Sequence, residues 1–268
     1  MTDSGRATYV YCLLSASAPP LLDDAPAGLP GLSPARALPV DDGLWLVVAD
    51  APLPEYGAAA VESRLDDLGW VSTRAVAHER VVEHFAEAAT VVPMKLFTMF
   101  SSDERAVRDL EERREQIGEI LERVTGRREW GVRIRVDEAA ARRALAEETA
   151  SLRGGGGVSG KEFLRHKQRQ RDAARELAAR AREDVDEVLA ALSREAADRR
   201  RLRAPTPEAA DRLLLDAVFL VAEERTEAFE ERVREAAERL ARHHCEVTLT
   251  GPWPPYNFAR PAEETAGP

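Results

Sequence analysis

This chain has few cysteines and no apolar run long enough to span a bilayer. Its two cysteines, Cys12 and Cys245, are too few for a disulfide framework, so we expect both as small buried residues in a reducing cytoplasm. The most apolar segment, residues 213–222, contains Asp216 and is shorter than the ~20 residues that cross a membrane. The apolar stretch near the N-terminus is too short for a secretory signal. These absences predict a soluble cytoplasmic protein that makes no contact with a membrane.

An excess of positive charge is also lacking. The formal net charge is -10, which disfavours general nucleic-acid binding because phosphates attract basic surfaces. A local basic run at residues 165–171 precedes acidic residues in the same predicted helix, which favours a solvated helix over an RNA site. Hydrophobic residues make up 44% of the chain, enough for a core, so disorder over the whole length is excluded.

The usual sequence frames for catalysis and metal binding are missing. The chain contains no G-x-S-x-G elbow, no C-x-x-C pair and no H-E-x-x-H frame. His78 and His84 are six residues apart on a predicted helix and therefore lie on different faces. His243, His244 and Cys245 are adjacent, so their side chains diverge. We predict that the protein is not an enzyme and holds no metal or cofactor.

A glycine-rich stretch has part of the sequence pattern of a phosphate-binding loop. Gly155, Gly160 and Lys161 match the spacing G-x-x-x-x-G-K, but Glu162 stands where the motif needs Ser or Thr. A carboxylate there would repel phosphates, and the preceding residues predict a helix instead of a buried strand. A break between two helices is the favoured interpretation. A nucleotide-dependent assembly chaperone that uses residues 154–161 is the alternative function.

The first part of the chain predicts strands and one long loop. Residues 7–14 and 43–50 are rich in β-branched and aromatic residues, as strands are. The second of these is expected to form a hairpin with residues 35–40 through an Asp-Gly step. Residues 15–34 are loaded with Pro, Gly, Ser and Asp and predict a loop.

Helices are predicted next. Apolar residues recur at helical spacing over residues 65–89. A second helix is expected to begin after an N-cap at Ser102 and to stop at Gly126. Its predicted apolar stripe consists of Val107, Leu110, Ile117, Leu121 and Val124.

From residue 129 the predicted order is strand, helix, short strand, strand, helix, strand. The elements are expected at residues 129–136, 159–199, 201–204, 213–221, 225–242 and 245–250. This βαββαβ order is typical of a ferredoxin-like domain, here with a long and interrupted first helix. The sequence therefore predicts an α+β protein with an N-terminal α+β domain at residues 1–126. A C-terminal ferredoxin-like domain with an extended tail is predicted at residues 127–268.

Two segments are candidates for contacts with other proteins. Residues 91–97 predict an edge segment, because Pro93 cannot donate to a central ladder. Residues 251–258 hold three prolines and three aromatic residues, and either pack back on their own domain, which is favoured, or offer a docking strip. The alternative that both segments are simply core stays open. The candidate contact residues are Val91, Val92, Lys95, Phe97, Trp253, Pro254, Pro255, Tyr256 and Phe258.

Taken together, these segments resemble the gas vesicle protein F/L family. The resemblance runs in order through residues 9–14, 44–50, 78, 91–100, 129–132, 160–165 and 213–222. Its most specific piece is Gly-Pro-Trp-Pro-Pro-Tyr-Asn-Phe at residues 251–258. Phe163 supplies the aromatic of the family's helix start, which is a mild departure.

The resemblance implies a two-domain α+β accessory protein that is needed to form gas vesicles. Members of the family are minor vesicle components. The expected partners are the small hydrophobic gas vesicle shell protein and other accessory gas vesicle proteins, and the expected location is the cytoplasm, in association with the vesicle. No catalytic residues belong to the family. A partner would cover an apolar patch or pair with an exposed strand edge, since the shell protein must be kept from aggregating before it joins the shell.

Overall fold

The computed structural model describes residues 5–137, 168, 181–202 and 213–259. Contacts divide the chain into two compact units, Met1–Glu129 with Pro252–Pro268 and Trp130–Gly251. The tail from Pro252 therefore groups with the N-terminal unit, whereas the sequence placed it with the C-terminal domain. The glycine-rich stretch at residues 154–161 and the basic positions of the run 165–171 lie outside the described residues.

The first unit contains a five-stranded sheet in the described part of the chain. Its strands are β1 (Arg6–Ser15), β2 (Arg36–Asp41), β3 (Leu44–Pro52), β4 (Thr90–Pro93) and β5 (Met99–Phe100). The order is β2-β3-β1-β4, and β5 also pairs with β1. The predicted hairpin is confirmed: β2 and β3 are antiparallel, and Gly43 takes the left-handed φ of 75° that the turn requires.

Strand β1 is buried on both faces, from Ala7 to Leu14. Its pairing with β3 shifts register between Val10 and Cys12, so Tyr11 occupies a β-bulge. The bulge lets Tyr9, Tyr11, Cys12 and Leu14 join the same hydrophobic cluster, although strict alternation would separate Tyr11 from Cys12.

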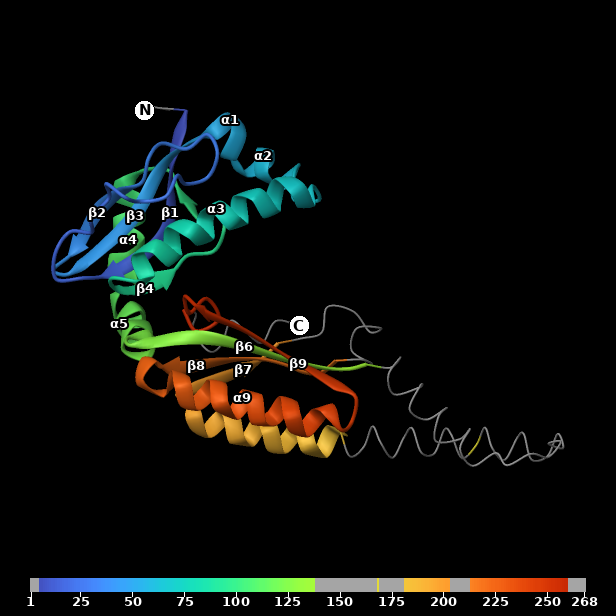
Figure 1. Cartoon of the computed structure of the whole chain (residues 1–268). Coiled ribbons are helices and arrows are strands. Elements are labelled where there is room, and N and C mark those ends of the chain that lie inside the picture. Colours follow the sequence, from blue (N-terminus) through green and yellow to red (C-terminus); the bar gives the residue numbers. More distant parts are fainter. Residues whose placement is uncertain (1–4, 138–167, 169–180, 203–212, 260–268) are drawn as a thin grey trace, which may run out of the picture. The chain divides into compact units, whose positions relative to one another are not determined.

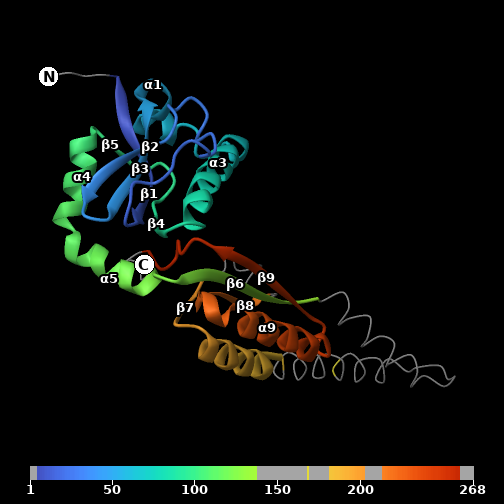
Figure 2. The same cartoon turned by 60° about the vertical axis from the view of Figure 1, so that its left-hand side comes forward.

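Helices cover both faces of this sheet, with α3 on one side and α4 on the other (Figures 1 and 2). The helices of the unit are α1 (Leu53–Tyr56), α2 (Ala58–Glu62), α3 (Leu68–Ala86), α4 (Asp103–Glu112) and α5 (Arg114–Val124). Side chains cap two of them, because Asp67 accepts a hydrogen bond from the Trp70 amide and Ser102 from the Arg105 amide. The cap predicted at Ser102 is thus confirmed.

The helix predicted up to Gly126 is broken, and two residues of its stripe are wrong. The chain turns at Arg113, where φ is -109° and ψ is 21°. The buried residues are Ala106, Leu110, Ile117, Ile120 and Val124, in place of Val107 and Leu121. In α4, Asp103 faces the sheet: it accepts a hydrogen bond from Thr8 at 2.7 Å and pairs with Arg36 at 2.6 Å. Residues three and seven positions after it therefore face the sheet.

The second unit has a four-stranded sheet in the described residues. Its strands are β6 (Arg127–Val136), β7 (Asp198–Arg201), β8 (Leu213–Ala222) and β9 (Cys245–Trp253), in the order β7-β8-β6-β9. The predicted alternation in β6 is confirmed by burial of Trp130, Val132 and Ile134. The helix expected to continue to residue 199 ends at residue 195 instead. Asp198–Arg201 forms strand β7 of the sheet, because it pairs antiparallel with β8.

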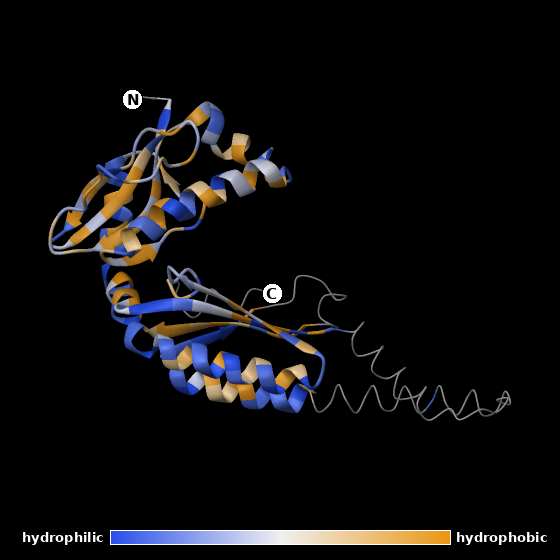
Figure 3. Ribbon diagram, in the orientation of Figure 1, coloured by the Kyte–Doolittle hydropathy of each residue, from blue (hydrophilic) through white to orange (hydrophobic). Residues whose placement is uncertain are grey.

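Two helices lie side by side on one face of the second sheet (Figure 1). They are residues 181–195 and α9 (Thr226–Ala241), which follows a short 3-10 turn, η1 (Glu223–Arg225). Their inward faces are apolar and their outward faces hydrophilic (Figure 3). Phe229 anchors the core, with its ring centroid 5.3 Å from Phe219 and 6.2 Å from Trp130.

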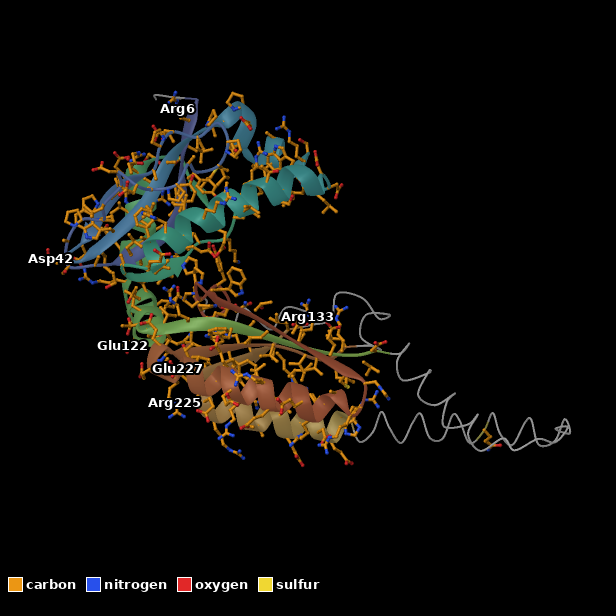
Figure 4. All side chains as sticks on the ribbon, in the orientation of Figure 1. Arg6, Asp42, Glu122, Arg133, Arg225 and Glu227 are labelled. Carbon is orange, nitrogen blue, oxygen red and sulfur yellow. The ribbon has the colours of Figure 1, made fainter. Side chains whose placement is uncertain are left out.

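Several ion pairs lie on the surface of the second unit. Arg225, the last residue of η1, pairs with Glu195, and Arg133 on β6 pairs with Asp216 on β8 at 2.9 Å. Figure 4 labels Arg133 and Arg225. Such partly exposed pairs contribute about 0–1 kcal/mol each, so the apolar core dominates the stability of this unit. No helix in the described part of the chain is long and apolar enough to cross a membrane.

A substitution at Gly28 can test how tightly the loop of residues 15–34 packs on β1. A Cβ atom at Gly28 would lie 1.9 Å from the Tyr11 hydroxyl, which accepts a hydrogen bond from the Leu29 amide at 3.1 Å. We expect Gly28→Ala to lower the free energy of unfolding by about 1–3 kcal/mol, because Tyr11 or the loop must move. Urea denaturation measures the change.

Gly118→Ala is the matched control. Gly118 lies within α5 and a Cβ atom there has no neighbour within 4 Å. Alanine should stabilise the helix by about 0.5–1 kcal/mol, since it restricts the unfolded chain more than glycine does. Equal effects of the two substitutions would contradict the tight packing of the loop on Tyr11.

Candidate protein-interaction site

Both candidate segments line one pocket in the first unit, which we call the β4–α5 pocket. It has a volume of about 240 Å³ and lies between the chain from β4 to Thr98, helix α5 and the tail. Leu13 of the central strand also lines it. The lining residues are Leu13, Val92, Pro93, Met94, Lys95, Thr98, Leu110, Arg113, Gln116, Ile117, Ile120, Tyr256 and Ala259.

The predicted residues 91–97 divide between core, pocket and a separate aromatic contact. Val91 and Val92 are 3% and 4% exposed, so their side chains belong to the interior. Val92 also lines the pocket, and Lys95 lies exposed at its rim. Phe97 lies outside the lining and stacks on Trp70, with ring centroids 5.3 Å apart. β4 is last in the strand order and Pro93 is its last residue, as expected of an edge segment.

Most of the predicted tail residues pack back on the first unit. Pro254, Pro255 and Phe258 are buried, Tyr256 is half-buried and lines the pocket, and only Trp253 of these five is exposed, at 41%. The tail therefore does not offer a continuous apolar docking strip. Packing back, the favoured alternative, is what the structure has, but the contacts are in the N-terminal unit.

A buried carboxylate holds the tail in place. Glu129 is 4% exposed and accepts two hydrogen bonds from Asn257, one from the amide at 2.8 Å and one from the side chain at 2.5 Å. These bonds are charge-assisted, which makes them stronger than neutral ones. Sequence reasoning missed this pair because 128 residues separate the partners.

A chain of hydrogen bonds positions the residues after β4. His78 Nε2 lies 3.1 Å from the Met94 carbonyl, and His78 Nδ1 lies 2.7 Å from the Tyr9 hydroxyl. A carbonyl only accepts, so Nε2 carries the hydrogen and, in neutral histidine, Nδ1 accepts from Tyr9. The Tyr9 oxygen in turn accepts from the Phe97 amide at 3.4 Å. Phe97 has a φ of 65°, a strained value for an aromatic residue, and this bond helps to hold it.

Burial shifts the titration of this cluster. Desolvation lowers the pKa of His78 from 6.5 to about 4, opposed by its bond to Met94, which agrees with a neutral ring. Burial also raises the pKa of Tyr256, and the facing Glu79 carboxylate adds to the shift. The pKa of Glu79 is raised by burial, against the effect of Tyr256.

The rim of the pocket is cationic. Among the described residues that line it, Lys95 and Arg113 are cations and none is an acid. Arg113 pairs with Asp109 in the preceding turn. Lys95 makes no ion pair within the described part of the chain. The result is an apolar pocket with a positive charge at its edge.

A family model matches residues 7–260, described as gas vesicle synthesis protein GvpL/GvpF. The chain belongs to the GvpL/GvpF family. It is 31% identical to gas vesicle protein L of Streptomyces sp. (strain CB03234) over 264 residues, which cover 97% of this chain and 95% of the relative. It is 29% identical to gas vesicle protein F of the same strain, covering 94% of this chain and 98% of the relative.

Solved structures of GvpF have the same fold. The crystal structure of GvpF from Anabaena sp. PCC7120 matches with a TM-score of 0.67 at 19% identity, over 96% of this chain and 99% of that one. GvpF from Microcystis aeruginosa matches with a TM-score of 0.64 at 18% identity, over 95% and 99% of the two chains. The mixed α/β architecture is therefore shared with GvpF.

The described lining of the pocket in this GvpL/GvpF-family protein is mainly apolar, with the polar side chains of Lys95, Thr98, Arg113, Gln116 and Tyr256. The described lining holds no cysteine, serine or histidine, and no cluster of metal-ligating side chains occurs in the described residues. The thiol of Cys12 is fully buried and burial raises its pKa. Helix α5 supplies Gln116, Ile117 and Ile120, which the sequence analysis did not name as contacts, although the amphipathic spacing of this helix was visible. What was missing was any signal that the tail lies beside them.

The tail gives a matched pair of substitutions. Phe258 is fully buried and Trp253 is 41% exposed. We expect Phe258→Ala to lower the free energy of unfolding by about 3–5 kcal/mol. Trp253→Ala should lower it by about 1 kcal/mol or less, because less of its surface leaves water on folding. Urea denaturation of both variants checks this, and equal losses would contradict the packing of the tail.

His78 gives a dependence of stability on pH. Its pKa in the folded state, about 4, lies below the usual 6.5, so the unfolded chain binds more protons between these values. Stability from His78 is complete above pH 6.5 and is lost as pH falls towards 4, by about 3 kcal/mol in all. The raised pKa of Glu79 acts with the opposite sign, so each variant must be compared with the wild type.

We expect His78→Gln to remove most of this slope in urea denaturation measured between about pH 4 and 7. His84→Gln, at a partly exposed position of the same helix, is the control and should keep the slope. A slope unchanged in His78→Gln would show that a different group titrates.

Proposed function

We propose that this GvpL/GvpF-family protein is an accessory factor of gas vesicle assembly. It acts in the cytoplasm and at the vesicle, where it binds the small hydrophobic shell protein and other accessory gas vesicle proteins. The β4–α5 pocket is the proposed contact for the shell protein. The observation that carries this proposal is that two segments, chosen separately from the sequence, line one apolar pocket.

The size of the pocket favours a protein partner over a small ligand. Sites for cofactors and drug-sized molecules usually measure about 300–1,000 Å³. The β4–α5 pocket, at about 240 Å³, is smaller, and two of the residues that line it, Lys95 and Arg113, are exposed. Protein interfaces are often anchored by one apolar side chain that fills such a pocket, with weaker contacts around it.

The edge of β4 is the weaker candidate for the same partner. β4 has four residues, and its last residue, Pro93, has no N–H to donate to an added strand. Short edge strands with proline resist pairing with other chains. A partner that pairs with β4 would gain few main-chain bonds, so we assign the contact to side chains in the pocket.

A non-enzymatic role fits the family and the lining. The family is one of gas vesicle proteins, and the curated relatives carry gas vesicle names. The polar side chains of the described lining are two cations, one amide and the hydroxyls of Thr98 and Tyr256, and the lining contains no cysteine, serine or histidine. We therefore propose that the protein works through binding and assembly, without a cofactor.

We also propose that Trp130–Gly251 forms the ferredoxin-like part of the protein. The strand order β9-β6-β8-β7, with α9 between β8 and β9, supports this assignment. The domains proposed from the sequence, residues 1–126 and 127–268, differ from the contact units mainly in the tail. The tail would then be a segment of the C-terminal domain that stabilises the N-terminal one.

Filling the pocket tests the proposed contact. Gln116 lies on α5, is half-buried and lines the pocket. We expect Gln116→Trp to weaken binding of purified shell protein by about tenfold or more, because the indole occupies the space for the anchor. Glu119→Trp, at an exposed position of the same helix, is the matched control and should bind normally. Thermal unfolding of both variants confirms that each is folded.

The same variants can be scored in cells. In a strain that lacks this gene, the wild type should restore buoyancy and pressure-collapsible light scattering. Glu119→Trp and Lys161→Ala should restore them as well, whereas Gln116→Trp should not. Restoration by Gln116→Trp would exclude the pocket as the essential contact. Failure of Lys161→Ala would support the nucleotide-dependent alternative.

A further inference from the structure

The lysine at the rim of the β4–α5 pocket is unusual for this chain. The protein has 38 basic residues, of which only Lys95, Lys161 and Lys167 are lysines. Lys95 is the one lysine among the described residues. It is exposed and, within that part of the chain, has no ion-pair partner, whereas Arg113 and Arg114 are paired with Asp109 and Asp41.

The charge at the pocket opposes the charge of the protein. The chain carries a formal net charge of -10, yet the described lining has two cations and no acid. The first turn of α5 lines the pocket through Gln116 and Ile117, and its N-cap residue Arg113 makes no capping bond with its side chain. Arg113 is already paired with Asp109, and Glu115 lies in the same first turn of α5, so the positive charge available at the rim is that of Lys95, which has no ion pair within the described residues. A negative group at the rim would therefore be stabilised.

The interior of the same pocket selects an apolar group. Leu13, Leu110, Ile117 and Ile120 are each at most 6% exposed and form its apolar walls. A carboxylate placed among them would lose its hydration without a buried partner, which is costly. The apolar walls favour an apolar side chain inside the pocket, and the positive charge favours a carboxylate at the rim. A short protein segment that contains both kinds of side chain fits these two requirements.

We propose that the occupant of the β4–α5 pocket is an acidic, apolar segment of the gas vesicle shell protein. One apolar side chain fills the pocket and a neighbouring carboxylate pairs with Lys95 at its rim. This inference rests on the proposed function and deepens it, since it states the chemistry of the contact. The acidic segment need only place its carboxylate within about 4 Å of Lys95 Nζ, the range of an ion pair.

Charge reversal tests the pairing. We expect Lys95→Glu to weaken binding of purified shell protein by about fivefold to tenfold, while Lys95→Arg keeps it within about twofold. Raising the salt from about 0.05 M to about 0.5 M should weaken wild-type binding and strengthen binding of Lys95→Glu, because salt screens an attraction in the wild type and a repulsion between like charges in the variant. Lys95 is exposed, so its substitutions should leave thermal unfolding unaltered.

Zero-length crosslinking identifies the partner group. A carbodiimide joins a lysine amine to a carboxylate that touches it, and does not join a guanidinium. In the complex of full-length protein and shell protein, mass spectrometry should find Lys95 linked to an acid of the shell protein. Lys95→Arg should lose that crosslink but keep binding, which separates contact from charge.

The outcomes separate this inference from the function on which it rests. If neither the wild type nor a variant that lacks residues 261–268 binds the shell protein, the proposed function fails. If it binds and Lys95→Glu binds equally well, or if crosslinks arise only at Lys161 and Lys167, only the acidic segment is overturned. If binding appears only after removal of residues 261–268, which include Glu263 and Glu264, the chain's own acidic end is the occupant and the inference is overturned.

Discussion

The structure of the first unit depends on burying strand β1 on both of its faces. Eight consecutive residues, Ala7 to Leu14, are buried, so both sides of the sheet must be covered by helices. The β-bulge at Tyr11 then lets adjacent residues, Tyr11 and Cys12, join one cluster with α3. The next residue, Leu13, lines the β4–α5 pocket instead. One local irregularity in one strand thus assigns side chains both to the core and to the candidate site.

Hydrogen bonds of the buried His78 connect strand β1 to the lining of the candidate site. Tyr9 of β1 donates to His78 of α3, and His78 donates to the carbonyl of Met94, which lines the pocket. The neutral ring is what makes both bonds available at once, and burial keeps it neutral by lowering its pKa to about 4. The segment that follows β4 is therefore placed by a polar contact inside an apolar core, where an unmet hydrogen bond is costly.

The tail contributes both to the packing of the first unit and to the lining of the candidate pocket. Phe258 and the Glu129–Asn257 bonds fix it to the first unit, and this brings Tyr256 into the wall of the pocket. A docking strip would have left these aromatics exposed. Packing instead makes the tail part of a concave surface, and concave apolar surfaces with a charged rim are suited to anchoring one side chain of a partner.

Local features of the fold could be predicted from the sequence alone. The hairpin at Gly43, the cap at Ser102 and the alternation in β6 depend on residues within a few positions of one another, so the sequence states them directly. The order of the elements and the family resemblance followed from the same local patterns. Two candidate segments were also found this way, because prolines and aromatics mark them.

Only the tertiary structure decided which residues meet. The stripe predicted for one helix falls on two, α4 and α5, and in α4 the buried positions agree with the contact of Asp103 with Thr8, 95 residues away. The tail lies on the N-terminal unit because of a pair 128 residues apart, Glu129 and Asn257. The bulge at Tyr11 and the neutral state of His78 likewise depend on distant partners, and the position of Lys95 at the pocket depends on how β4, α5 and the tail pack together. Sequence patterns carry short-range preferences, whereas burial and charge pairing are fixed by the whole folded chain.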